Sequence, residues 1–369
     1  MSDHKGLDSL IQSPEVSSLG VHSLAEILSQ PQFWARTIHQ LQSLGTMDDL
    51  RQRVEGAAEW LFIGCGSSYY VALSAAATWT AVTGQRARAV AASELLLFPE
   101  LFLSPAEKRV AALISRSGST SETIKVARLL GQHKNVTTLA VSVSANSSLE
   151  KATAVTLPLP EGGEKSTVMT LSFSSMLLGL QYLAATLGGD QVVLESLARL
   201  PAAAEPVLKS LHPRIRHFVA ERDFADYVCL GQGPLYGIAC ETALKITEMS
   251  VSYSQSFHTL EFRHGPKSIV SPETLVIFLL SEQAYDAECG VLEEIKSLGG
   301  TTIAIANRAD QRARAASDLL VELNFDLPEL AQLAPYIFAG QLIGLYTGRK
   351  KNMDPDNPRN LTRVVILND

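Results

Sequence analysis

Short apolar runs, each followed by a polar loop and then by a helix-forming stretch, recur along this chain. The first run, at 60–63, leads into Gly64-Cys-Gly-Ser-Ser and an alanine-rich stretch at 69–82. Further runs in the first half lie at 109–114, 136–143 and 154–159, and a long apolar stretch follows at 168–187. Runs of this length before a helix are typical of buried strands in a parallel sheet. The pattern therefore predicts βα units and an α/β fold.

The same order returns in the second half of the chain. Apolar runs lie at 226–231, 274–281 and 301–307, and helix-forming stretches follow the first two at 235–249 and 288–298. Leu61, Ser115 and Thr137 are matched by Val228, Ser281 and Thr301, at separations of 167, 166 and 164 positions. Repeats at nearly constant spacing predict two duplicated αβα domains with parallel sheets.

The predicted domain boundaries follow from these runs. A helical leader is expected at 1–44, and its Ser-rich first 20 residues are expected to form a loosely ordered arm. The first αβα domain is expected at 45–190, a helical connector at 191–221, the second αβα domain at 222–348 and a tail at 349–369.

Composition and charge exclude several classes of protein. The 369 residues, 46% hydrophobic and 19% charged, suit two soluble domains of ordinary size. A net charge of -7 without a basic stripe offers nucleic acid no binding surface, so we expect no nucleic-acid partner. No apolar stretch suggests an export signal or a membrane span, and the four cysteines are too scattered for a zinc or redox motif. We expect no membrane partner and a location in the reducing cytoplasm.

Three loops rich in hydroxyl groups are candidates for a phosphate site. After the run at 109–114, Ser115, Ser117, Ser119 and Thr120 surround Gly118. Ser67 and Ser68 hold the equivalent place after the first run, and Ser166 and Thr167 stand in a third loop. Hydroxyl groups and free amides at a helix N-terminus bind anions, and such loops converge at the C-terminal edge of a parallel sheet. Ser and Thr at these positions also cap helices without any ligand.

These loops fit a monophosphate better than a nucleotide. Tyr69 stands where the dinucleotide fingerprint needs its third glycine, Glu94 is a weak candidate for its acidic residue, and no Gly-Lys-Ser/Thr occurs. The eight histidines do not pair at metal-binding spacing. We predict no cofactor, no metal, and a small phosphorylated molecule as the ligand.

A second candidate site lies in the repeated half. Glu241, Lys245 and Glu248 recur at steps of four and three, so their side chains share one helix face. His264 follows, directly before the turn-forming pair Gly265-Pro266. A carboxylate, an amine and an imidazole together supply acid and base catalysis. The same residues also fit a solvated salt-bridge face and an ordinary loop histidine.

On these motifs, the region 45–369 resembles proteins with two sugar isomerase (SIS) domains, which have flavodoxin-like αβα folds. Within that family it is similar to the isomerase half of glutamine:fructose-6-phosphate amidotransferase and to phosphosugar deaminases and isomerases. The resemblance implies that the loop Ser115-Arg-Ser-Gly-Ser-Thr and two neighbouring loops hold the sugar phosphate. The phosphate-binding residues so implied are Ser68, Ser115, Arg116, Ser117, Thr120, Ser166 and Thr167.

The resemblance also implies catalytic roles. Glu248 matches the glutamate that moves a proton between C1 and C2 of the sugar, with Glu241 and Lys245 as its companions. His264 matches the histidine that assists ring opening and that comes from the neighbouring subunit, so a homodimer is expected. The tail at 356–365 resembles an active-site tail, with Arg363 where the synthase has a lysine. Arginine stays protonated and cannot form a Schiff base.

The predicted function follows from this resemblance and from the features in which the sequence differs from the synthase. About 44 residues precede the first predicted SIS domain, so we expect a chain without the glutaminase domain of the synthase. The segment Arg263-His-Gly-Pro-Lys-Ser instead resembles the branch of tagatose-6-phosphate isomerase and galactosamine-6-phosphate deaminase. We predict a phosphosugar aldose-ketose isomerase or deaminase that acts on a hexose or amino sugar 6-phosphate. The alternatives are a fructosamine-6-phosphate deglycase, and a sugar-phosphate sensor that performs no chemistry.

Overall fold

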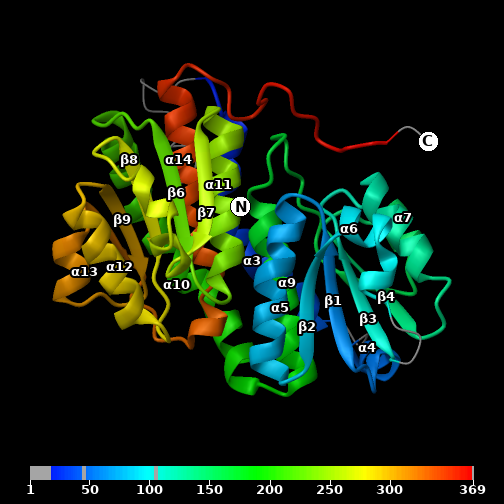
Figure 1. Cartoon of the computed structure of the whole chain (residues 1–369). Coiled ribbons are helices and arrows are strands. Elements are labelled where there is room, and N and C mark those ends of the chain that lie inside the picture. The colour runs from blue at the N-terminus through cyan, green and yellow to red at the C-terminus, as the bar shows by residue number, and fades with distance from the viewer. Residues whose placement is uncertain (1–17, 44–46, 104–106, 368–369) are drawn as a thin grey trace.

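The computed structural model describes residues 18–43, 47–103 and 107–367. Most of the arm expected at 1–20 lies outside the described residues. The described chain forms two αβα domains side by side, with a layer of helices between their two sheets (Figure 1).

Each domain is built on a parallel five-stranded sheet. The first sheet contains β1 (Glu59–Gly64), β2 (Arg86–Ala91), β3 (Arg109–Ile114), β4 (Val136–Ser142) and β5 (Val155–Pro158), in the order β2-β1-β3-β4-β5. The second contains β6 (Asp226–Gly231), β7 (Tyr253–His258), β8 (Thr274–Leu279), β9 (Thr301–Ala306) and β10 (Leu319–Glu322), in the order β10-β9-β8-β6-β7. Because β6 to β10 repeat the order of β1 to β5, the predicted duplication and the flavodoxin-like α/β fold are confirmed.

The apolar runs predict the central strands but not the edge strands β2, β7 and β10. Polar side chains interrupt two of these strands: Arg86 and Arg88 in β2, and Ser254, Gln255 and Ser256 in β7. A strand at a sheet edge is only partly covered, so it needs no continuous apolar run.

Helices cover both faces of each sheet. The layer between the domains contains α5 (Ser67–Thr83), α9 (Leu171–Gly188), α11 (Leu235–Ser250) and α14 (Ile337–Lys350), with α2 (Val21–Leu28), α3 (Gln30–Ser43) and the connecting helix α10 (Gln191–Ala220) packed beside them. On the outer faces lie α6 (Ala92–Leu97), α7 (Ser121–Leu130) and α8 (Ser148–Ala152) in the first domain, and α12 (Tyr285–Ser297) and α13 (Gln311–Ala316) in the second. The short helix α4 (Met47–Val54) precedes β1.

Alternating side chains in β1 show how the layers share the core. Trp60 and Phe62 pack with the helices between the domains, whereas Leu61 and Ile63 pack with the outer helices. Among the described helices, α9 alone is long and apolar enough to cross a membrane, and 78% of it is buried inside the protein. The core between the sheets therefore accounts for its apolar sequence.

The strand registers correct one expected correspondence between the halves. Arg109 of β3 and Thr274 of β8 pair with the first residues of equivalent strands, so they are equivalent positions. Ser115 therefore corresponds to Leu280, and not to Ser281 as the sequence spacing indicated. The amides of Ser115 and Leu280 both donate to a carbonyl oxygen of the neighbouring central strand. The second domain thus lacks a hydroxyl group at this position.

Candidate active site

The three charged residues of α11 form a buried cluster. Lys245 Nζ lies 3.3 Å from Glu241 Oε1, and it donates a hydrogen bond to Glu248 Oε2. The side chains of Glu241 and Lys245 are fully buried, whereas 18% of the Glu248 side chain is exposed. The cluster is therefore not a solvated salt-bridge face, and Glu248 is the member that a bound molecule can reach.

Small residues bring three helices close enough to bury this cluster. Gly237 of α11 lies against α5, where a Cβ atom would come within 2.4 Å of the Tyr70 carbonyl oxygen. Gly344 of α14 lies against α11, where a Cβ atom would come within 2.7 Å of the Lys245 carbonyl oxygen. A larger side chain at either position would separate the helices, because interiors are close-packed. These two glycines therefore let α5 and α14 enclose the segment of α11 that carries Lys245.

Burial and charge set the protonation of the cluster. Burial raises the pKa of Glu241 to about 8, although Lys245 beside it favours the ionised form. Burial disfavours the charged form of Lys245, but Glu241 and Glu248 outweigh it and raise the pKa of that ammonium group. Lys245 therefore stays charged, while Glu241 holds a proton near neutral pH. Such a cluster can hold and transfer a proton close to the Glu248 carboxylate.

The first domain meets this cluster through Ser67. Ser67 and Ser68 begin α5, directly after the glycine loop that ends β1, and both are buried. The Ser67 hydroxyl accepts a hydrogen bond from Lys245 Nζ at 3.3 Å. Since β1 pairs with β3, the loop at 115–120 ends the neighbouring strand. The hydroxyl-rich edge of the first sheet therefore adjoins the charged face of α11.

The loop between β3 and α7 is held in a turn by its own groups. The hydroxyl oxygens of Ser115 and Thr120 lie 3.1 Å apart, and the Ser119 amide donates to Ser117 Oγ at 3.2 Å. Gly118 has a φ of 59°, and a Cβ atom there would lie 2.3 Å from a neighbouring serine side chain, so only glycine fits. Ser117 and Thr120 are half-buried at the N-terminus of α7. This position suits the binding of an anion.

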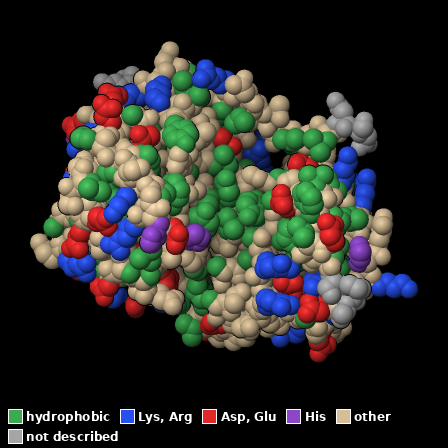
Figure 2. All heavy atoms as spheres, in the orientation of Figure 1, with side chains coloured by type: hydrophobic (Ala, Val, Ile, Leu, Met, Phe, Trp, Pro, Cys, Tyr) green, Lys and Arg blue, Asp and Glu red, His purple; other side chains and the backbone are tan. Residues whose placement is uncertain are grey.

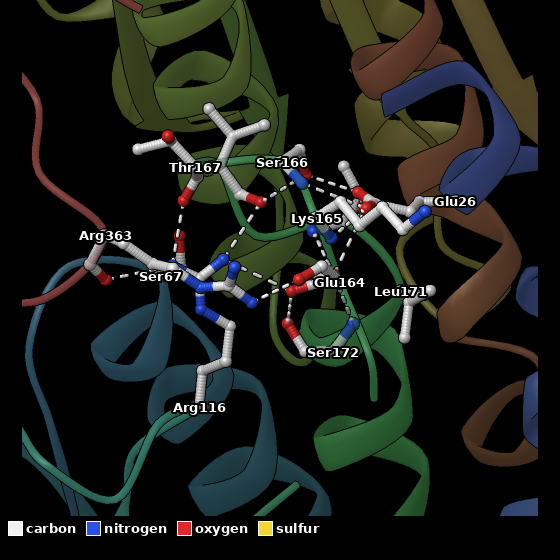
Figure 3. A network of polar contacts seen from close by, with 12 residues as sticks. Glu26, Ser67, Arg116, Glu164, Lys165, Ser166, Thr167, Leu171, Ser172 and Arg363 are labelled. Atoms are coloured by element: carbon white, nitrogen blue, oxygen red, sulfur yellow. Dashed lines mark hydrogen bonds and ion pairs between the residues drawn. The ribbon is translucent and has the colours of Figure 1, made fainter. Parts of the chain in front are cut away.

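Arg116, within the same loop, ties it to two other segments (Figure 3). Its guanidinium group donates to Glu164 Oε2 at 3.2 Å and to the carbonyl oxygens of Thr167 and Val168 at 2.8 and 3.1 Å. It also donates to the carbonyl oxygen of Arg363 at 3.0 Å. Protein acceptors thus engage both terminal nitrogens of Arg116, and through them Arg116 positions the loop. Its role as a phosphate ligand stays a prediction.

Ser166 is also committed to contacts within the protein. It is fully buried, and its hydroxyl group contacts Glu26 of α2 and the carbonyl oxygen of Val168. The neighbouring Thr167 is half-buried, and its amide donates to the carbonyl oxygen of Asp356 at 2.8 Å. In this structure the Ser166 hydroxyl group is engaged by protein atoms, and its role as a phosphate ligand stays a prediction. The loop at 164–168 supports the loop at 115–120 through the bonds that its carbonyl oxygens accept from Arg116.

The C-terminal tail runs across the first domain beside these loops (Figure 1). The Asp356 carboxylate accepts the Ser23 amide at 2.6 Å, which fixes the tail to the start of α2. Arg363 donates to the carbonyl oxygen of Glu164, and the Ser121 amide at the start of α7 donates to a tail carbonyl oxygen at 3.3 Å. The structure thus places Arg363 next to the loop that carries Arg116.

Cysteine and metal chemistry have little support at this site. All four cysteines are free, and burial raises the pKa of Cys65, which lies in the glycine loop after β1, to about 11. Its reactive thiolate form is therefore scarce at neutral pH. In the part of the chain that the structure describes, no group of three or more His, Cys, Asp or Glu side chains is arranged to hold a metal ion.

Comparison with known proteins identifies the family. The family described as SIS domain matches residues 56–186 and 227–341, one segment in each αβα domain. The chain belongs to the SIS domain family.

Relatives of this SIS protein act on sugar phosphates. The chain is 25% identical over 308 residues to the isomerizing glutamine–fructose-6-phosphate aminotransferase of Methanothermobacter thermautotrophicus, a match that covers 83% of this chain and 51% of the relative. The chain thus spans about half the length of the curated relatives it matches. The solved glucosamine-6-phosphate deaminase of Thermotoga maritima is 27% identical with a TM-score of 0.76, covering 94% of this chain and 100% of that one. The tagatose-6-phosphate ketose/aldose isomerase of Escherichia coli shares the fold, with a TM-score of 0.83 at 22% identity and coverage of 97% and 99%.

His264 of this SIS protein lies at the surface, after β7 and the short helix Glu261–Arg263. Its side chain is exposed, and within the described residues no hydrogen bond or ion pair joins it to the α11 cluster. The adjacent Arg263 donates to Glu294 at 2.7 Å, which fixes this segment to α12. A single chain therefore does not bring His264 into contact with the cluster.

Hydrophobic side chains gather on one face of the molecule, over the junction between the two SIS domains (Figure 2). Large apolar side chains are exposed in both domains: Tyr253 of β7 is 65% exposed, and Leu97 at the end of α6 is 68% exposed. Contiguous apolar surface of this kind is typical of a face that another protein covers.

Sequence reasoning missed two carboxyl groups that shape the site, Glu26 and Glu164. Glu164 accepts the Thr170 and Ser172 amides at 2.8 and 2.9 Å, and so caps α9 while it holds Arg116. The available signals were a glutamate among the apolar residues of Ser23-Leu-Ala-Glu-Ile-Leu and another in the polar loop before α9. Neither signal shows which residues the glutamate contacts, because those residues are distant in the sequence.

Proposed function

We propose that this SIS protein is a phosphosugar aldose-ketose isomerase or deaminase that acts on a hexose or amino sugar 6-phosphate. The observation that carries the proposal is the buried cluster of Glu241, Lys245 and Glu248, which lies against Ser67 of the hydroxyl-rich first domain. An acid/base group beside an anion site is what such a reaction needs. Relatives named for aminotransfer and deamination of sugar 6-phosphates support the substrate class.

The first domain anchors the substrate. Its phosphate group binds the hydroxyl groups at the C-terminal edge of the first sheet, near the positive N-terminal end of the α7 dipole. The proposed hydroxyl ligands are Ser68, Ser115, Ser117 and Thr120. The Thr167 backbone lies near them, because Arg116 of the same loop donates to the Thr167 carbonyl oxygen. Binding energy from the phosphate, which is remote from the reacting carbons, then orients C1 and C2 against α11.

The second domain performs the chemistry. Glu248 takes a proton from one carbon of the opened sugar and returns it to the neighbouring carbon. Lys245 donates a hydrogen bond that orients the Glu248 carboxylate, and the neighbouring Glu241 holds the proton that its raised pKa allows. Where C2 carries an amine, the same proton shift gives an imine, which water hydrolyses to a ketone and ammonia. Arg363 cannot form a Schiff base in this scheme.

A panel of sugars tests this function. Glucosamine, galactosamine and fructosamine 6-phosphates and the corresponding hexose 6-phosphates are assayed for ammonia release and for the isomeric product. We expect at least one 6-phosphate to be converted, and its unphosphorylated form to have a kcat/KM at least about 100-fold lower, because the phosphate anchor is lost. If no sugar phosphate is converted while one of them raises the melting temperature, the protein is a sensor and the proposal is wrong.

We further propose that the protein acts as a homodimer in the cytoplasm, with His264 of each subunit serving the other subunit's site. The exposed His264, its lack of contact with the cluster of its own chain and the apolar face over the domain junction support the dimer. Four free cysteines suit a reducing compartment.

Mixed dimers test this arrangement. Homodimers of His264→Asn and of Glu248→Gln should each be inactive. After the two variants are mixed and allowed to exchange subunits, one site of each heterodimer regains both groups, so activity should return to about a quarter of wild type. If the mixture stays inactive although exchange is complete, His264 does not act across the interface.

A further inference from the structure

Glu26 of α2 reaches the loop before α9 from the leader (Figure 3). Its Oε1 accepts the amides of Lys165 and Ser166 at 2.6 and 3.0 Å. Its Oε2 contacts the Ser166 hydroxyl group and lies 3.1 Å from the Thr170 hydroxyl group. Glu26 is buried, and each of these bonds joins it to an uncharged group.

A second buried carboxyl group, Glu164, shares one of these partners. Thr170 Oγ1 lies 3.1 Å from Glu164 Oε1 as well, although the hydroxyl group has a single proton to donate. Glu164 also receives the Arg116 guanidinium group at 3.2 Å and the Ser172 hydroxyl group at 2.6 Å. Of the two carboxyl groups, Glu164 is therefore the one with a cation as its partner.

A buried carboxyl group without a cation of its own is disfavoured in its charged form. Burial and then the neighbouring Glu164 raise the pKa of Glu26. Glu26 also lies in the last turn of α2, where the carbonyl end of the helix disfavours a negative charge. The charges of Asp356 and Lys165 do not lower the pKa of Glu26. Asp356 is itself an acid and bonds to the opposite end of α2, and the Lys165 side chain is exposed.

We propose that Glu26 is a neutral carboxylic acid and a positioning residue for the phosphate-binding end of the site. With its proton on Oε2, Glu26 donates to Ser166 Oγ, and Ser166 donates to the Val168 carbonyl oxygen at 3.0 Å. Thr170 then donates to Glu164 at 3.1 Å. Every proton in the chain of contacts has one acceptor, so the buried groups are satisfied without sharing.

The loop that Glu26 holds supports the phosphate end directly. The carbonyl oxygens of Thr167 and Val168 accept Arg116 from the loop at 115–120, and the Thr167 amide bonds the tail at Asp356. Displacement of the 164–168 loop would therefore move both the Arg116 loop and the tail. This inference rests on the proposed function, because it takes the Arg116 loop as the phosphate site.

Substitution of Glu26 in the full chain separates a neutral acid from a carboxylate. Glutamine has the shape and the donor of the neutral acid, so Glu26→Gln should keep kcat and KM within about twofold of wild type. Glu26→Ala should raise KM at least about tenfold while kcat changes less than about threefold, because the anchoring end alone is loosened. Glu195→Gln, at an exposed position on α10, is the matched control and should change nothing.

Two readouts do not depend on turnover. Because the folded pKa of Glu26 is raised, its contribution to stability is full at low pH and is lost as the pH rises through that value. As the pH rises above the ordinary value of 4.5, the melting temperature of Glu26→Gln should therefore rise relative to that of wild type, and Glu26→Ala should have the lowest melting temperature. An infrared difference spectrum of wild type against Glu26→Gln should show the loss of a protonated carboxyl band at neutral pH.

Glu26→Gln as damaging as Glu26→Ala, or an infrared spectrum without that loss, would overturn the proposal. So would a Glu26→Ala variant with the melting temperature and KM of wild type. If the order of stabilities and the infrared band are as expected but no sugar phosphate is converted, the proposed function fails while Glu26 is still assigned as a neutral acid.

Discussion

The Glu248→Gln variant is expected to bind its sugar phosphate as wild type does and to convert it about 10²–10⁴-fold more slowly, the usual contribution of a positioned acid/base group. Glutamine keeps the shape of the side chain and its contact with Lys245 but has no carboxylate to accept a proton. KM should change little, because the phosphate anchor lies in the other domain. Steady-state kinetics and calorimetric binding of the same sugar phosphate separate the two effects.

The control for this variant is Glu195→Gln, which makes the same chemical change at an exposed position of α10. A Glu248→Gln variant with the rate of wild type would show that another group moves the proton. A variant that loses binding and rate together would show that Glu248 anchors the substrate rather than acting on it.

Loss of Lys245 is expected to destabilise the fold strongly. Lys245→Met removes a fully buried ammonium group and leaves the Glu248 carboxylate without its paired cation. Removal of one partner of a buried ion pair typically costs about 3–5 kcal/mol. Turnover should fall as well, because Glu248 loses the hydrogen bond that orients it. Urea denaturation measured at pH 6 and pH 9 gives the change in unfolding free energy.

The pH dependence of this loss follows from Glu241. Its folded pKa of about 8 lies above the ordinary value of 4.5, so its protonated form stabilises the fold, and this contribution fades between those two pH values. Without Lys245 the charged form becomes still less favourable, so Lys245→Met should lose more stability at pH 9 than at pH 6. The added change Glu241→Gln should recover part of the loss. Lys209→Met, which breaks an exposed pair with Glu205, is the control, and an equal loss in both variants would contradict the account.

The sequence predicted those parts of the fold that repeat a simple pattern. The runs at 60–63 and 109–114 are buried on both faces, so their apolar character alone marks them as central strands. The edge strand β7 is polar from Ser254 to Ser256 and is only partly buried, so it carries no such apolar run. The correspondence of Ser115 with Leu280 needed the hydrogen-bonded registers, because similar residues one position apart suggest a false match.

The candidate site, too, could be predicted only in part from the sequence. Glu241, Lys245 and Glu248 share one helix face, and helical spacing alone brings them together. The resemblance implied a phosphate ligand at Arg116, but it gave no sign of the partners Glu164 and Arg363, which lie in other segments that only the folded chain brings near. Contacts between residues so far apart depend on how the domains pack and leave no periodic signal.

The central claim is that one substrate is anchored in the first domain and reacts in the second. A crystal structure of Glu248→Gln with its sugar 6-phosphate bound tests this most directly, because the variant should hold the substrate without converting it. The account predicts the phosphate within hydrogen-bonding distance of Ser117 and Thr120, with C1 and C2 against residue 248. A phosphate bound at the loop after β8, or a sugar whose C1 and C2 lie away from α11, would contradict it.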